Sequence, residues 1–320
     1  MKPGVMLYDA SVGGRLILRG EDRRSFLHNF CTNDVESLVD GGACEAFVTD
    51  MRGHVVSHVW ISAQSEELWL HAVGASLETL RSHLEKYVIT EDVVIEDRTM
   101  STSRALVCGV DCEAAADAIV AISPDRIHRA TVGWVGDRDV LLWGEGEEDQ
   151  ELPLAAVAVG VPVGSPESFD ARRIAALLPI VGQDIGPENL AQEVDRDSLA
   201  ISFAKGCYLG QETIARVQSR GRVNRLLRGL ECDGGWWPET GAVIRGEQET
   251  EVGRVGSVAP RDASEGGPAG SAIALAVVGT FFARVRNAES SVMAALYRAV
   301  WRWHFIAGLL ILPFVLILGI

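Results

Sequence analysis

The stretch of this chain that is most informative about its fold is Lys205-Gly206-Cys207-Tyr208-Leu209-Gly210-Gln211-Glu212. It sets one cysteine between two glycines, and residues 212–217, which follow, have helical composition. Cys207 is therefore expected near a loop-to-helix junction, where the helix N-terminus and Lys205 would lower the pKa of the thiol and favour the thiolate. The alternative is a small buried cysteine in a glycine-rich packing turn.

The octapeptide matches the signature K-G-C-[FY]-x-G-Q-E of the YgfZ-like proteins, a branch of the aminomethyltransferase superfamily that contains the glycine-cleavage T-protein. The chain resembles this family over residues 5–278. Weaker matches occur in the family's order at Phe26-Leu27-His28-Asn29, Thr32-Asn33-Asp34-Val35, Lys86-Tyr87-Val88-Ile89 and Ile201-Ser202-Phe203.

The resemblance implies an α+β fold in which two intertwined α/β domains and a C-terminal β-barrel surround a central folate-sized hole. Residues 1–100 and 165–225 would form the folate-binding domain, residues 101–164 a second α+β subdomain and residues 226–280 the barrel.

The sequence pattern gives a matching set of elements. Alternating or apolar runs at 47–49, 55–61 and 68–71 predict a meander, and leucines at helical spacing predict a helix over 77–87 that packs on this sheet. Short strands between glycines over 226–276 are consistent with a small barrel.

The resemblance also implies a tetrahydrofolate-binding factor that supports iron–sulfur enzymes, including those that modify tRNA, with Cys207 as the catalytic group. The residues carried over as cofactor-binding are Lys205, Gly206, Tyr208, Gly210, Gln211, Glu212, Arg216, Arg225 and Asn33. Two alternatives stay open: a folate-dependent one-carbon (aminomethyl) transferase, and a membrane-tethered module that has lost its chemistry.

Two departures from the superfamily bear on the ligand. The T-protein has an acidic pair that supplies its catalytic aspartate, and the positions counted from Gly53 read Ser57 and His58 here, so general acid–base help is missing. In the family helix R-I-E-A-G-x-P the glutamate contacts the pterin, and this chain has Ala175 there. Unmatched pterin donors and acceptors cost about 1–3 kcal/mol, so tetrahydrofolate is expected to bind weakly.

Arginines follow the cysteine motif on a chain whose net charge is −15. They are Arg216, Arg220, Arg222, Arg225 and Arg228. This cluster suits a phosphate or a polycarboxylate such as the glutamyl tail of folate; the alternative is a solvated face paired with neighbouring acids. The acidic balance argues against bulk nucleic-acid binding.

The six cysteines include no CxxC pair, which predicts reduced thiols in a cytosolic compartment and gives no metal site. Cys108 and Cys112 have helical ligand spacing, but no third and fourth ligand follow them at zinc-finger spacing. The histidines at positions 28, 54, 58, 71 and 83 show no recurring ligand pattern either.

The family likeness ends near residue 278, and the chain then changes character. Arg298, Trp301, Arg302 and Trp303 precede an apolar run without a charge, 305–320, which resembles the opening of a PepSY-associated membrane protein. We expect residues 281–298 to form a linker and 299–320 a transmembrane helix, with the preceding arginines holding the body in the cytoplasm. The alternative is a buried C-terminal core helix. The abrupt end of the run also fits a truncated multi-span protein.

Overall fold

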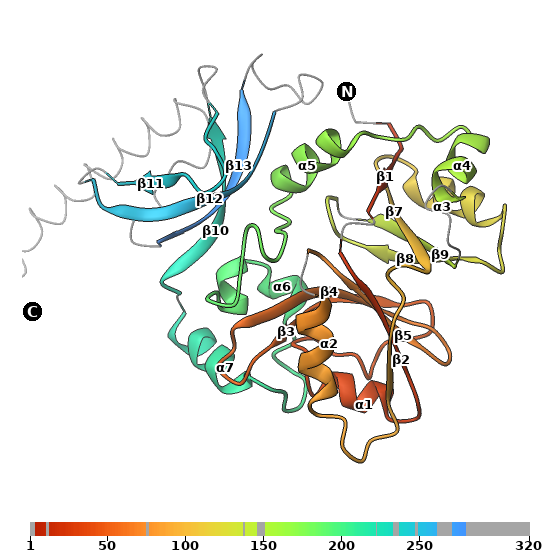
Figure 1. The fold of residues 1–320 in the computed structure, drawn as a ribbon, viewed down its shortest axis with the longest axis horizontal. Coiled ribbons are helices and arrows are strands. Elements are labelled where there is room, and N and C mark those ends of the chain that lie inside the picture. Colours follow the sequence, from red (N-terminus) through yellow and green to blue (C-terminus); the bar gives the residue numbers. More distant parts are fainter. Residues whose placement is uncertain are drawn as a thin grey trace, which may run out of the picture. The chain divides into compact units, whose positions relative to one another are not determined.

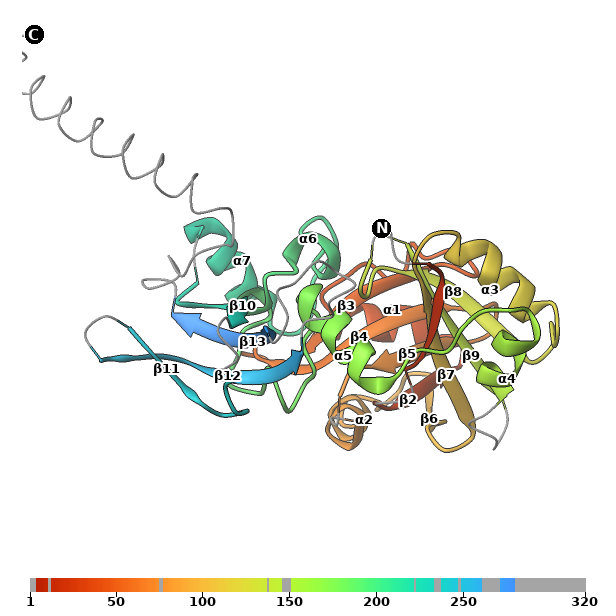
Figure 2. The same cartoon turned by 90° about the horizontal axis from the view of Figure 1, so that it is seen from above.

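Three antiparallel sheets make up the fold (Figures 1 and 2). The computed structural model describes residues 4–279 except 11–12, 75–76, 137, 146–150, 222, 233–236, 247–248 and 261–270. The predicted linker and transmembrane helix lie outside the described residues. None of the helices in the described part is long and apolar enough to span a membrane.

The first sheet has five strands in the order β3 (Ala43–Thr49), β4 (Val55–Ala63), β5 (Leu68–Ala72), β2 (Arg15–Arg19) and β6 (Val94–Asp97). The predicted meander is confirmed as β3, β4 and β5. Helices α1 (Arg23–His28) and α2 (Leu77–Glu85) cover one face, where alternation along β2 places Leu16 and Leu18. The predicted packing of the second helix on this sheet is confirmed, because Leu80 and Leu84 belong to that core.

The second sheet lies on the other face of the first. Its strands run in the order β1 (Met6–Asp9), β7 (Thr102–Cys108), β9 (Asp139–Glu145) and β8 (Ile127–Val132). Trp60 and Trp69 of the first sheet pack with Trp143 of the second, and helices α3 (Cys112–Val120) and α4 (Glu151–Ala158) cover its far face. Strand β1 comes from the range predicted for the first domain but pairs in this sheet. The domain division as a whole stays a prediction.

The third sheet corrects the predicted barrel. Strands β10 (Arg225–Cys232), β13 (Ala272–Gly279), β12 (Glu251–Pro260) and β11 (Val243–Arg245) form an open sheet in that order, with β10 and β11 at its edges among the described strands. Its apolar face is buried against helix α5 (Pro166–Ala175), where Leu275 packs with Ala171 and Ile174. Because a helix covers this face, the strands do not need to close on themselves to bury it.

The segment that leads to the cysteine motif packs in the same core as this third sheet. It consists of the 3₁₀ turn η1 (Ala191–Val194), helix α6 (Asp197–Ala200), an irregular loop and helix α7 (Gln211–Arg220). Ile201 and Tyr208 share this core with Phe47 and Val55 of the first sheet. The motif is thus held between the β3–β4 hairpin and the third sheet.

Candidate functional site

We define the cysteine loop as residues 202–210, between α6 and α7. Cys207 is exposed in this loop, and α7 begins at Gln211 with Gly210 as its N-cap. The predicted position at a loop-to-helix junction is confirmed, and the alternative of a buried packing cysteine is wrong. The effect of the helix and of Lys205 on the thiol stays a prediction.

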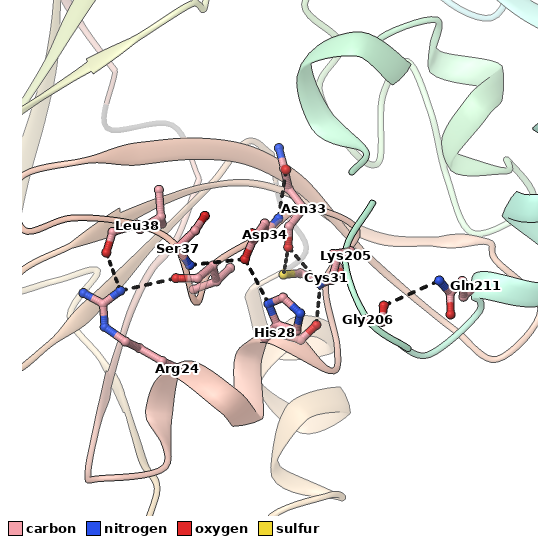
Figure 3. A network of polar contacts seen from close by, with 11 residues as sticks. Arg24, His28, Cys31, Asn33, Asp34, Ser37, Leu38, Lys205, Gly206 and Gln211 are labelled. Carbon is pink, nitrogen blue, oxygen red and sulfur yellow. Dashed lines mark hydrogen bonds and ion pairs between the residues drawn. The ribbon is translucent and has the colours of Figure 1, made fainter. Parts of the chain in front are cut away.

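Lys205 ties the cysteine loop to the segment that follows α1. Its ammonium donates hydrogen bonds to three backbone carbonyls, those of His28 (2.5 Å), Cys31 (2.9 Å) and Asn33 (2.8 Å; Figure 3). Nζ also lies 5.0 Å from the centre of the Tyr208 ring. Burial lowers the pKa of Lys205. Because all three ammonium hydrogens are used, this side chain anchors the loop, and its cofactor role stays a prediction.

Asn33 is used by the fold in a similar way. Its amide nitrogen donates to the carbonyls of Glu45 (2.8 Å) and Leu199 (2.9 Å), and its Oδ1 accepts from the N–H of Asp34 (2.8 Å). The amide nitrogen therefore links β3 to α6, and the amide oxygen fixes the side chain to the backbone of the next residue. Its predicted contact with a cofactor stays a prediction.

Gly210 allows the loop to lie directly on the β3–β4 hairpin. Its φ is +86°, and a Cβ at this position would lie 2.5 Å from the carbonyl oxygen of Asp50 and 2.8 Å from Oγ1 of Thr49. The Thr49 hydroxyl donates to the carbonyl of Leu209 (2.8 Å) in the same contact. A glycine is needed here both for the left-handed backbone and for the close approach.

Gly210→Ala should therefore lower the free energy of unfolding by about 2–3 kcal/mol, since it adds a backbone clash to left-handed strain. Gly221 is the matched control: its φ is +69°, but nothing lies within 4 Å of the Cβ position. Gly221→Ala should cost about 1–2 kcal/mol, from strain alone. Chemical denaturation of both variants measures the difference, and equal losses would show that the contact with the hairpin does not constrain the loop.

The remaining motif residues divide into exposed and buried ones. Gly206 and Glu212 are exposed, like Cys207, whereas Tyr208 is buried and its pKa is raised by that burial to about 12. Gln211 donates its side-chain amide to the carbonyl of Gly206 at 3.5 Å. A ligand approaching from solvent would meet Gly206, Cys207 and Glu212 first.

The arginine cluster separates into two kinds of side chain. Arg225 pairs with Glu193 (3.1 Å) and Arg228 with Asp195 (2.6 Å), as in the alternative of a face paired with acids. Arg216 and Arg220 are exposed on α7, and no acidic partner is found for them among the described residues. Arg222 lies outside the described residues. Among the described arginines of this cluster, Arg216 and Arg220 on α7 are therefore the ones whose charge is available to an anionic ligand.

A buried charged network occupies the region of Ser57 and His58, both of which have no exposed surface. Glu45 accepts from Nε (2.5 Å) and an Nη (2.7 Å) of Arg196, and its Oε1 lies 2.8 Å from Nε2 of His58. Burial alone would raise the pKa of Glu45, but the hydrogen bonds from Arg196 and His58 outweigh it and lower that pKa. Burial lowers the pKa of His58. No sequence pattern indicates this network, because Glu45 and Arg196 are 151 positions apart in the chain.

The other departure from the superfamily lies at the surface. Ala175 is the last residue of α5 and is exposed. Leu177, at the family's glycine position, has a φ of +56°. Neither the buried pair, Ser57 and His58, nor Ala175 offers a carboxylate to a ligand. Within the described residues, no group of three or more His, Cys, Asp or Glu side chains could hold a metal ion.

Comparison with known proteins agrees with the motif, although no family model matches the chain. A chloroplastic protein of Arabidopsis thaliana named as a transferase is 28% identical over 77% of this chain, and the alignment spans 60% of that protein. The aminomethyltransferase of Chloroherpeton thalassium is 25% identical, over 81% of this chain and 77% of its own length.

The tRNA-modifying protein YgfZ of Colwellia psychrerythraea is 26% identical, over 70% of this chain and 71% of its own length. The crystal structure of aminomethyltransferase T from Bartonella henselae superposes with a TM-score of 0.73 at 15% identity, covering 88% of this chain and 80% of that one. The last comparison shows the fold, and the sequence comparisons show descent. This chain is a distant homologue of the YgfZ proteins and the aminomethyltransferases, with the mixed α+β fold of the T-protein.

Proposed function

We propose that this chain is a YgfZ-like factor that binds tetrahydrofolate and supports iron–sulfur enzymes through the thiol of Cys207. The observation that carries the proposal is an exposed thiol on an anchored loop. Besides the Lys205 anchor, the N–H of Leu209 donates to the carbonyl of Asn29 at 2.9 Å. A reactive group gains from such rigid support. Two of the relatives are named as tRNA-modifying proteins. We therefore expect the supported iron–sulfur enzymes to include enzymes that modify tRNA.

Tetrahydrofolate is proposed to bind weakly and mainly through its glutamyl tail, in the central hole that the family resemblance implies. Carboxylates of the tail would pair with Arg216 and Arg220, which α7 exposes beside the cysteine loop. The pterin end would find no carboxylate at Ser57, His58 or Ala175. For the same reason aminomethyl transfer, the activity named for several relatives, is disfavoured as the function of this chain.

Rescue of an iron–sulfur enzyme in a bacterium that lacks its own YgfZ-like gene tests this function. Expression of the full chain should restore the activity of that enzyme. A chain that accumulates to a normal level in folded form without restoring the activity would contradict the proposal.

The apolar C-terminal run is proposed to anchor the chain in a membrane. A helix over 299–320 is about 33 Å long at 1.5 Å per residue, enough to cross a bilayer core of about 30 Å. The full chain should therefore fractionate with membranes and resist extraction by alkaline carbonate, whereas a chain ending at residue 280 should be extracted. A full chain that stays in solution without detergent would refute the anchor.

A further inference from the structure

The exposed arginines of the described chain fall into two groups. One group is paired with acids: Arg126 with Glu151 (3.3 Å), Arg138 with Glu113 (2.7 Å), Arg245 with Glu249 (3.9 Å) and Arg254 with Glu251 (2.9 Å). For the other group, Arg52, Arg216 and Arg220, no acidic partner is found among the described residues. On a chain whose net charge is −15, these three keep their charge for an anion from outside the chain.

These three arginines lie at one place in the fold. Arg52 is in the turn of the β3–β4 hairpin, which ends beside α7 (Figure 1). A Cβ on the next residue, Gly53, would lie 3.2 Å from Cβ of Thr213, in the first turn of α7. Thr213, Arg216 and Arg220 follow one another at spacings of three and four residues and so share one face of the helix. Arg52 therefore continues this face at its N-terminal end, and we call the three side chains the arginine row.

The turn that carries Arg52 is held in place by Asp50. Oδ1 of Asp50 accepts from the backbone N–H groups of Arg52 (2.8 Å) and His54 (2.9 Å), and its carbonyl accepts from the N–H of Gly53 (3.0 Å). The other carboxylate oxygen of Asp50 lies 3.4 Å from Nδ1 of His54. The Asp50 carboxylate is thus used by the turn, which fixes the backbone of Arg52 and leaves its guanidinium exposed.

The shape of the row suits a linear ligand. From Thr213 to Arg220 the helix rises by about 10 Å, at about 1.5 Å per residue. A row of this length and one side chain wide matches an extended chain that carries one carboxylate per unit, and each guanidinium can bind a carboxylate through two hydrogen bonds. RNA is also a linear polyanion, but the net charge of −15 disfavours it.

We infer that Arg52 is a third binding residue for the glutamyl tail of folate, beside Arg216 and Arg220, and that it makes the site select tails of several glutamates. This inference rests on the proposed function, which places the tail on α7. A single glutamate carries both of its carboxylates within one residue and is too short to reach all three arginines. Arg52 therefore contributes to the binding of long tails more than to that of the monoglutamate.

Titration of the full chain with the monoglutamate and the triglutamate of tetrahydrofolate tests the inference. Arg52→Ala should lower the affinity for the triglutamate about fivefold, the effect of one exposed ion pair, and that for the monoglutamate less than about twofold. Arg52→Lys should retain part of the triglutamate affinity, because an ammonium keeps the charge without the guanidinium fork. Arg138→Ala, the matched control, removes the same charge from an exposed arginine that pairs with Glu113 of α3, and should change neither affinity.

Wild-type affinity for the triglutamate in Arg52→Ala, or equal losses for the two folates, would overturn the inference. An equal loss in Arg138→Ala would overturn it as well, because net charge alone would then explain the effect. Binding of a single-stranded RNA oligonucleotide that depends on Arg52, with triglutamate binding that does not, would assign the row to nucleic acid instead.

The same titration with a γ-linked glutamate trimer that lacks the pterin separates this inference from the proposed function. If neither folate binds but the trimer binds and Arg52→Ala weakens it, folate binding is rejected and the arginine row stands as a polycarboxylate site. If the folates bind and neither tail length nor Arg52 matters, the inference fails and folate binding stands. If neither the folates nor the trimer bind, both fail.

Discussion

Replacing Arg196 by methionine should lower the free energy of unfolding by about 3–5 kcal/mol. The guanidinium makes two hydrogen bonds to Glu45, whose side chain is 5% exposed, and a third to the carbonyl of Gly133 at 3.0 Å. Without it, the Glu45 carboxylate stays buried, and His58 is the partner that remains to it among the described residues. Urea denaturation followed by tryptophan fluorescence measures the loss, because Trp60 and Trp134 pack in the adjoining core.

Arg19→Met is the matched control for this loss. Arg19 pairs with Glu67 and Glu96, but its side chain is 34% exposed and solvent already screens these charges. Its replacement should cost less than about 1 kcal/mol. Equal losses in the two variants would contradict the view that the Glu45–His58–Arg196 network is a desolvated structural element.

The same network predicts how stability depends on pH. Burial lowers the pKa of His58 from the usual 6.5, so the unfolded chain binds more protons than the folded one below that pH. The contribution of His58 is complete above pH 6.5 and is lost as the pH falls through the folded-state value. Glu45 adds a loss in the same direction below pH 4.5. The melting temperature should therefore be lower at pH 5.5 than at pH 7.5, and His58→Gln should reduce that difference.

Cys207→Ala should abolish rescue of the iron–sulfur enzyme and leave the melting temperature nearly unchanged, since the side chain is exposed and its removal opens no cavity. Cys108→Ala should do the reverse. Cys108 is 1% exposed in the core between the first and second sheets, so its loss should cost about 1–2 kcal/mol and leave rescue intact. Full rescue by Cys207→Ala would reject the role of the thiol.

The parts of the fold that the sequence predicted correctly are those set by local patterns. The glycines around Cys207, the helix after it and the β3–β4–β5 meander each depend on residues close together in the chain. The barrel was wrong because strand patterns do not show whether a helix such as α5 covers the apolar face. Closure depends on such a partner.

In the candidate site, too, local sequence patterns predict some features, whereas others depend on residues that only the fold brings together. Lys205 was expected to act on its sequence neighbour Cys207, but its hydrogen bonds go to carbonyls 172–177 positions away. Glu45 and Arg196 each look like an ordinary charged residue until the fold brings them together.

Titration of the full chain with tetrahydrofolate carrying one or several glutamates tests the central claim most directly. We expect the polyglutamate form to bind about tenfold more tightly, and this advantage to shrink between about 0.05 M and 0.5 M salt as the carboxylate–arginine pairs are screened. The double variant Arg216→Ala, Arg220→Ala should lose the advantage. The absence of binding by either form, or equal affinities that salt does not change, would contradict the account.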